Sequence, residues 1–81
     1  MNNQNLELYY LENCPYCHKV FDFMEKHDIE LKMIDISDNP EATRRLKKEG
    51  GKKQVPCLFI DGHPLYESDD IIQWFKDNYI K

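Results

Sequence analysis

Long hydrophobic runs are missing from this 81-residue sequence. The polar start MNNQN is followed by an apolar stretch that is too short and too interrupted for a signal peptide or a membrane-spanning helix. Positive charge is also scarce, because 11 lysines and arginines stand against 15 aspartates and glutamates, for a net charge of -4. Since phosphate binding needs an excess of positive charge on one face, nucleic acid is not an expected partner. We expect a cytoplasmic protein with no membrane partner.

Internal repeats, low-complexity tracts and linkers rich in glycine, proline or serine are absent as well. A chain of 81 residues has room for one hydrophobic core, and its 41% hydrophobic and 32% charged residues are ordinary for a globular protein. We therefore predict a single domain over residues 1–81.

Cysteine is rare, since the chain has three, far below the density of a disulfide-stabilised secreted domain. Cys14 and Cys17 stand three positions apart in the motif CPYC. A disulfide across so short a loop should stabilise the fold by only about 2 kcal/mol, before any strain is subtracted. A catalytic or metal-binding pair explains this spacing better than a structural disulfide does.

Hydrophobic patterns and capping signals predict alternating strands and helices. Residues 6–11 predict a strand, and Pro15 at a first helical position predicts a helix to about residue 27 with Cys14 as its N-cap. Residues 30–36 predict a second strand, and residues 40–49 a helix that Asn39 caps and two glycines close.

The last third predicts a β-hairpin and a final helix. Residues 55–60 predict a third strand, which the turn DGHP joins to a short strand around residues 65–66. Ser68 is predicted to cap the last helix, whose apolar content comes from Ile71, Ile72, Trp74, Phe75 and Tyr79. The first strand–helix–strand unit should be parallel and right-handed, whereas the hairpin is antiparallel. The fold class is therefore α/β, a four-stranded mixed sheet flanked by three helices.

The predicted start of the first helix gives the two cysteines different roles. Cys14 at the N-cap faces unpaired N–H groups and the positive end of the helix dipole, which favour the thiolate. Cys17 lies one turn inside the helix, more shielded, and on the same face. We predict that Cys14 is the nucleophile and that Cys17 resolves a mixed disulfide formed on Cys14.

The same pair could instead supply half of a zinc or iron site. Two further ligands would be needed, and the candidates form no second CxxC or HxxxH motif: Cys57, His18, His27 and His63. We predict no metal site. The histidines are expected at the surface or in turns, and Cys57 is expected in the core because cysteine is among the most buried residue types.

With CPYC after a predicted strand and Val-Pro opening a later one, nearly the whole chain resembles the dithiol glutaredoxins of the thioredoxin fold. The resemblance implies a monomeric enzyme that reduces protein disulfides and glutathione mixed disulfides. Glutathione would be its co-substrate, with no tightly bound cofactor. The resemblance also implies that Pro56 is cis and packs beside Cys14, and that the backbone of Val55 binds the cysteinyl part of glutathione.

The C-terminal third differs from many glutaredoxins, which have Thr before Val-Pro and a Gly-Gly-Asp-like turn before the last helix. The stretch QVPCLFIDGHPLYESDDIIQWF instead resembles the N-terminal domain of glutathione S-transferases, where Gln-Val-Pro and Glu-Ser hold glutathione. This implies a glutathione site made by Gln54, Val55, Pro56, Glu67, Ser68 and Asp69. The start of the last helix suits the γ-glutamyl carboxylate, and Glu67 or Asp69 suits the ammonium. Without the resemblance, Ser68 would be read only as a helix cap.

Two further contacts are open at this point. Tyr16, between the cysteines, either lines the glutathione groove or covers the sulfur. Glutaredoxins often carry Lys or Arg shortly before the first cysteine, whereas residues 11–13 here are Leu, Glu and Asn. One of three lysines either compensates by binding the glycyl carboxylate of glutathione or is simply solvated: Lys19, Lys52 or Lys53.

Three rival functions accompany the prediction of a glutaredoxin-type thiol-disulfide oxidoreductase. A redoxin reduced by thioredoxin reductase is disfavoured, because it would not need a glutathione site at Gln54, Glu67 and Ser68. A carrier of an iron–sulfur cluster would hold it between two protomers with Cys14 and glutathione, and the proline after Cys14 disfavours this by resemblance. A glutathione-binding module derived from a transferase would lack a second domain for a hydrophobic co-substrate.

Overall fold

The computed structural model describes residues 5–51 and 54–78 of the chain. The elements run in the order β1 (Leu6–Tyr10), α1 (Pro15–Lys26), β2 (Lys32–Asp35), α2 (Pro40–Gly50), β3 (Cys57–Ile60), β4 (His63–Leu65) and α3 (Ser68–Asn78). This is the order that the sequence predicts, with ends that differ by a few residues. Lys52, Lys53 and Tyr79 lie outside the described residues. None of the three helices within the described ranges has the length and apolar character needed to cross a membrane.

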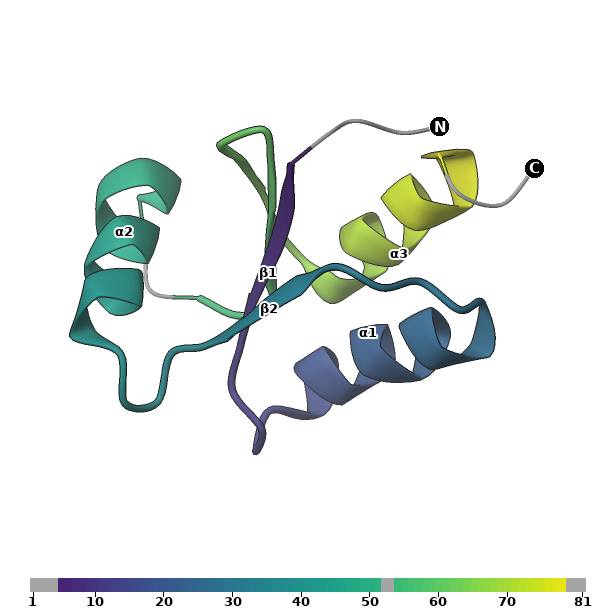
Figure 1. Cartoon of the computed structure of the whole chain (residues 1–81), viewed down its shortest axis with the longest axis horizontal. Helices are drawn as coiled ribbons and strands as arrows, with labels where there is room; N and C mark the ends of the chain where they lie inside the picture. The colour runs from purple at the N-terminus through teal and green to yellow at the C-terminus, as the bar shows by residue number, and fades with distance from the viewer. Residues whose placement is uncertain (1–4, 52–53, 79–81) are drawn as a thin grey trace.

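The four strands form one mixed sheet in the order β2-β1-β3-β4. β1 and β2 are parallel, with Tyr9 beside Ile34, and α1 connects them (Figure 1). β3 is antiparallel to β1, with Leu8 beside Leu58, and β4 is antiparallel to β3. The predicted parallel unit and the predicted hairpin are both confirmed.

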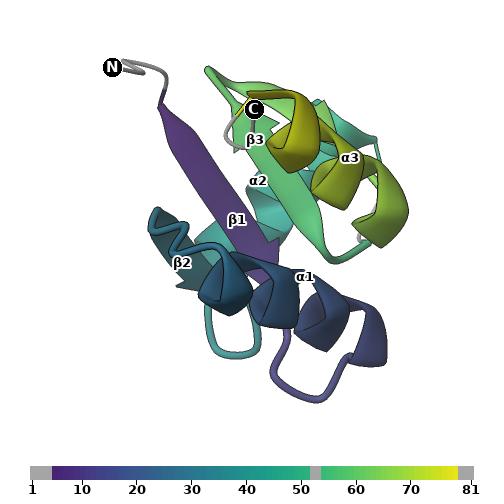
Figure 2. The same ribbon diagram turned by 90° about the vertical axis from the view of Figure 1, so that its right-hand side faces the viewer.

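The helices cover both faces of this sheet. α1 and α3 lie together on one face, and α2 lies alone on the other (Figures 1 and 2). Because side chains alternate along a strand, β1 sends Leu6 and Leu8 toward α1 and α3, and Tyr9 toward α2. Two cores result. One contains Leu6, Leu8, Val20, Met24, Ile29, Leu58, Ile71 and Phe75, and the other contains Tyr9, Ile36, Ala42, Leu46, Cys57 and Phe59.

The first two helices start as their sequences predict. Cys14 is the N-cap of α1 in an extended conformation, with φ -91° and ψ 116°, and proline follows it at the first helical position. The side-chain oxygen of Asn39 accepts a hydrogen bond of 3.1 Å from the N–H of Ala42 at the start of α2. Gly51 ends that helix with φ +82°, a conformation that favours glycine.

The last helix corrects the sequence prediction by one position. α3 begins at Ser68 itself, and the carbonyl of Glu67 accepts a hydrogen bond of 2.9 Å from the N–H of Ile71. Glu67 therefore holds the cap position, and Ser68 belongs to the first turn. β3 likewise begins at Cys57, after Pro56, because proline has no N–H to donate to a strand neighbour.

The end of α2 packs closely against the residue that follows β4. A Cβ atom placed on Gly50 would lie 2.1 Å from the hydroxyl oxygen of Tyr66 and 3.1 Å from its ring carbon Cζ. Real Cβ atoms do not approach that closely, so only glycine fits at this contact. The Tyr66 hydroxyl in turn hydrogen-bonds with Cys57 on β3.

Candidate active site

Cys14 stands where the loop after β1 enters α1. Its N–H donates to the carbonyl of Leu11 at 3.2 Å, which closes a turn before the helix. Its own carbonyl accepts from the N–H groups of Cys17 at 3.1 Å and His18 at 3.2 Å, which starts the helix. The residue is partly exposed. The predicted position of Cys14, at an accessible helix start, is confirmed.

Cys17 lies in a very different environment one turn later. Its side chain is wholly buried, with 0% exposure. Burial raises the pKa of the Cys17 thiol to about 12, and the neighbouring Cys14 adds to the rise through a hydrogen bond and its charge. A hydrogen bond with the backbone of Leu11 opposes this rise in the pKa. The predicted shielding of Cys17 is confirmed, and this thiol keeps its proton at neutral pH.

The segment before β3 comes directly beside Cys14. The Cys14 thiol donates a hydrogen bond to the carbonyl oxygen of Val55, with Sγ and the oxygen 3.8 Å apart. The peptide bond between Val55 and Pro56 is cis, as the family resemblance implies. The backbone expected to bind the cysteinyl part of glutathione is therefore in contact with the predicted nucleophile.

A cavity of about 260 Å³ lies next to this contact. Three segments that are distant in the sequence build it: the first turn of α1, the residues before β3 and the start of α3. Its lining consists of Tyr16, Gln54, Val55, Pro56, Glu67, Ser68 and Asp69. These are the seven residues that the sequence predicts as glutathione contacts. The structure brings all of them together, and Tyr16, 63% exposed, lines the cavity. Their role as glutathione contacts stays a prediction.

The cavity carries charge of both signs. The side-chain nitrogen of Gln54 donates to a carboxylate oxygen of Glu67 at 3.4 Å. Ser68 is buried at the start of α3, where the first N–H groups have no partner within the helix and carry partial positive charge. Asp69 accepts a hydrogen bond of 2.6 Å from Lys19 of α1. Such a cavity suits a ligand that carries both a carboxylate and an ammonium group.

Two residues take positions that the sequence did not reveal. Lys19 pairs with Asp69, at the end of the cavity predicted for the γ-glutamyl group, and not at the glycyl end suggested for it. His18 is exposed as predicted, but its Nε2 also donates to the carbonyl of Glu12, which ties the loop before Cys14 to α1. Neither contact has a local sequence signal, because each depends on how the loop or α3 packs against α1.

Cys57 is wholly buried in the core under α2, which confirms the predicted core position. Burial raises the pKa of its thiol to about 11, while hydrogen bonds with Tyr66 and the backbone of Leu65 and the nearby charge of Arg45 oppose the rise. Burial and the neighbouring Cys57 raise the pKa of Tyr66 to about 12. Cys57 therefore faces away from the cavity chemistry as a protonated core residue.

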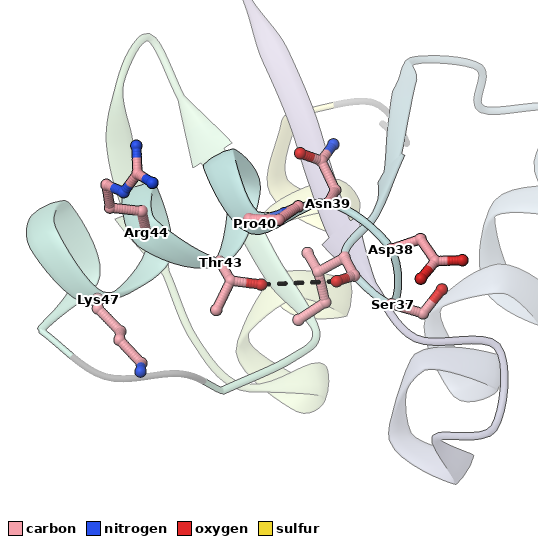
Figure 3. Close-up of a pocket in the computed structure, with 8 residues that line it drawn as sticks. Ser37, Asp38, Asn39, Pro40, Thr43, Arg44 and Lys47 are labelled. Atoms are coloured by element: carbon pink, nitrogen blue, oxygen red, sulfur yellow. Dashed lines mark hydrogen bonds between the residues drawn. The ribbon is translucent and has the colours of Figure 1, made fainter.

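A larger hollow of about 540 Å³ lies at the start of α2, away from the two cysteines. Figure 3 shows its lining residues, with the side chains of Arg44 and Lys47 extending in opposite directions. The Thr43 hydroxyl donates to the carbonyl of Ile36 at 3.5 Å, so the protein itself uses this polar group (Figure 3). The charged groups of this hollow do not converge on one point, unlike those of the cavity beside Cys14.

Metal binding has little support among the residues that can be placed. Within 5–51 and 54–78, no three His, Cys, Asp or Glu side chains are grouped so that they could hold a metal ion.

Comparisons with known proteins agree with the geometry. The sequence profile named Glutaredoxin matches residues 6–65. Glutaredoxin 3 of Escherichia coli strain K12 is 30% identical over 67 residues, which cover 83% of this chain and 81% of that protein.

Solved structures show the fold. The holo form of glutaredoxin C1 from Populus tremula x tremuloides has a TM-score of 0.70 at 18% identity, over 90% of this chain and 75% of that one. Glutathione transferase Omega 3C from Trametes versicolor has a TM-score of 0.81 at 23% identity. The match to the transferase covers 96% of this chain and 35% of the other, so this chain spans about a third of the transferase's length. The fold is thioredoxin-like, as predicted.

Proposed function

This chain belongs to the glutaredoxin family of glutathione-dependent thiol-disulfide oxidoreductases, and we propose that it reduces protein disulfides and glutathione mixed disulfides through Cys14 and Cys17. One observation carries the proposal. The cavity of seven predicted glutathione contacts opens beside Val55, whose carbonyl accepts the Cys14 hydrogen bond. A disulfide with glutathione in this cavity would bring its sulfur to Cys14.

The reaction begins with attack by Cys14. Its thiolate attacks the glutathione sulfur of a mixed disulfide, forms a new disulfide on Cys14 and releases the substrate as a thiolate, which takes up a proton. A second glutathione thiolate then attacks the bound glutathione sulfur. This step yields oxidised glutathione and returns Cys14 as a thiolate. A separate reductase supplies two electrons to regenerate glutathione.

Protein disulfides follow a route that also uses Cys17. Cys14 first forms a mixed disulfide with the substrate, and the Cys17 sulfur then attacks Cys14 and releases the second substrate thiol. Cys17 must lose its proton for this step. The charge and hydrogen bond of Cys14, which add to the raised pKa of Cys17, disappear once Cys14 is in a disulfide. Attack on Cys14 thus makes the resolving thiol easier to ionise, although burial still opposes ionisation.

Single cysteine variants test the proposal. We expect Cys14→Ser to abolish glutathione-coupled reduction of a small glutathione mixed disulfide, because the attacking sulfur is lost. Cys17→Ser should retain much of this activity, since glutathione itself can release Cys14. The assay follows NADPH consumption by glutathione reductase. Cys57→Ala is the matched control and should turn over as the wild type does, because this cysteine is buried under α2. Turnover by Cys14→Ser would disprove the assignment.

The same assay separates the redoxin rival. Replacing glutathione and its reductase by thioredoxin reductase should give little turnover, because the cavity beside Cys14 has charges suited to glutathione. We further propose that the enzyme acts as a monomer in the cytoplasm, where glutathione is kept reduced. Size-exclusion chromatography and cell fractionation test these two points.

A further inference from the structure

An ion pair joins the amino ends of α1 and α3 at the rim of the cavity. Nζ of Lys19 lies 2.6 Å from Oδ1 of Asp69, and the two side chains are 53% and 78% exposed. Exposed ion pairs contribute little to stability. The main effect of this pair is therefore on the charge that the cavity presents to a ligand.

Lys19 lies on the side of α1 that borders the cavity. It follows Tyr16 by three positions, and residues three apart are neighbours on a helix surface. Tyr16 and Asp69 both line the cavity. The Lys19 ammonium is therefore held at the cavity rim, beside the start of α3.

The two carboxylates of the cavity are held in different ways. Asp69 is paired with the positive charge of Lys19, whereas Glu67 accepts a hydrogen bond from the neutral amide of Gln54. Lys19 thus balances the charge of Asp69, and Glu67 keeps its own negative charge. Together with the first N–H groups of α3, this gives the cavity a positive side near Ser68 and a negative side at Glu67.

The γ-glutamyl end of glutathione has a matching arrangement of charge, with a carboxylate and an ammonium on one carbon atom. We propose that Lys19 is a specificity-determining residue, which neutralises Asp69 and so makes the cavity select disulfides that carry a γ-glutamyl group. This inference rests on the proposed function and adds a substrate preference to it. Lys19 acts on binding, because it contacts the cavity rim and not the reacting sulfur.

Single-turnover kinetics with the pre-reduced protein test the inference, since no glutathione is then needed as reductant. Two fluorescent peptide disulfides are compared, one carrying glutathione and one carrying cysteinylglycine, which lacks the γ-glutamyl group. Lys19→Gln should raise the half-saturating concentration of the glutathione substrate about fivefold, because an unpaired Asp69 repels the ligand carboxylate. The maximal rate and the cysteinylglycine values should stay as in the wild type.

Three further variants give the controls. Lys19→Arg should restore wild-type values, because it keeps the charge. The double variant Lys19→Gln/Asp69→Asn should recover part of the loss, because the repelling carboxylate is gone. Lys26→Gln, at the far end of the same helix, makes the same change in net charge and should behave as the wild type.

The outcomes separate this inference from the proposed function. A wild type that reduces neither substrate would disprove the proposed function, and the role of Lys19 with it. A wild type that reduces both, with Lys19→Gln changing both substrates equally or neither, would overturn the role of Lys19 alone. An unchanged melting temperature of Lys19→Gln is expected and shows that binding, and not folding, is measured.

Discussion

At the scale of single residues, the two sulfurs of CPYC differ in exposure although one helical turn separates them. Cys14 ends a loop and is partly exposed, and Cys17 is covered on all sides. The difference follows from the helix start, because Cys14 at the N-cap faces out of the helix whereas Cys17 points between α1 and the sheet. One sulfur is therefore available to substrates, and the other can react only with its neighbour.

Alkylation measures this difference directly. We expect iodoacetamide at pH 7.5 to add a single group to the folded, reduced protein, at Cys14. With its pKa at about 12, Cys17 has a thiolate fraction below about one in ten thousand at this pH, and its side chain is inaccessible. Intact mass spectrometry counts the adducts.

The controls are a variant and a denatured sample. Cys14→Ser should take up no group while folded, and the wild type in urea should take up three, one for each cysteine. Rapid addition of a second group to the folded wild type would show that Cys17 or Cys57 is exposed.

How far single residues can be predicted depends on the range of the interaction. The N-cap position of Cys14 follows from Pro15, a neighbour in the sequence, so local chemistry is enough to predict it. The cavity residues were predicted from the family resemblance, because the contact between Cys14 and Val55 joins segments that local patterns cannot connect. The pairing of Lys19 with Asp69 could not be predicted, since it depends on how two helices pack.

At the scale of elements, α2 is positioned on its face of the sheet by a contact that has no space for a side chain. Gly50 at the end of α2 meets the hydroxyl of Tyr66, the residue that follows β4. The sequence predicted this glycine only as a helix terminator. The packing shows a second reason for it, which is the close approach of a tyrosine.

Gly50→Ala should therefore destabilise the protein. Helix propensity alone favours alanine by about 1 kcal/mol. The added Cβ would lie 2.1 Å from the Tyr66 hydroxyl, and such overpacking typically costs about 1–3 kcal/mol. We expect the clash to prevail, with a lower free energy of unfolding in urea titrations.

The double variant Gly50→Ala/Tyr66→Phe shows whether the hydroxyl is the cause. Removing this oxygen leaves ring carbon Cζ as the nearest atom, at 3.1 Å, so most of the lost stability should return. A single variant Gly50→Ala that is more stable than the wild type would contradict the contact.

Elements were easier to predict than their ends. Proline at the first position and a capping residue before it mark the starts of α1 and α2, and both starts were correct. The start of α3 was placed one residue late, because serine is a common cap and the glutamate before it is not. Its cap is the carbonyl of Glu67, and a backbone group leaves no mark in the sequence.

At the scale of the whole molecule, both cores contain a group that is buried with its proton. Cys17 lies under α1, and Cys57, which hydrogen-bonds with Tyr66, lies under α2. Burial raises the pKa values of Cys17, Cys57 and Tyr66 above those in the unfolded chain. Between its two pKa values, each group has lost its proton in the unfolded chain and kept it in the folded one. Alkaline pH therefore favours unfolding.

We expect the free energy of unfolding to be unaffected by these groups below pH 9 and to fall as pH rises above it. For Cys57, the window runs from the ordinary value of 9.0 to about 11. Within this window, Cys57→Ala should reduce the slope by about 1.4 kcal/mol per pH unit. Urea titrations at a series of pH values, with a reductant present, measure the slope.

Ile36→Val is the control for this prediction, because it removes one methyl group from the same core without changing any titrating group. It should lower stability at every pH by about 1 kcal/mol and keep the wild-type slope. Equal slopes for Cys57→Ala and the wild type would show that the Cys57 thiol ionises as readily in the folded protein as in the unfolded chain.

The order of the chain also decides when this catalytic centre comes into being. The nucleophile sits near the front, whereas the lining of the cavity includes the start of α3, the last element to leave the ribosome (Figure 1). A nascent chain thus exposes its first sulfur long before the docking place for glutathione exists. Thiol reactivity precedes selectivity during synthesis, and the newborn polypeptide is open to indiscriminate oxidation until its final helix settles.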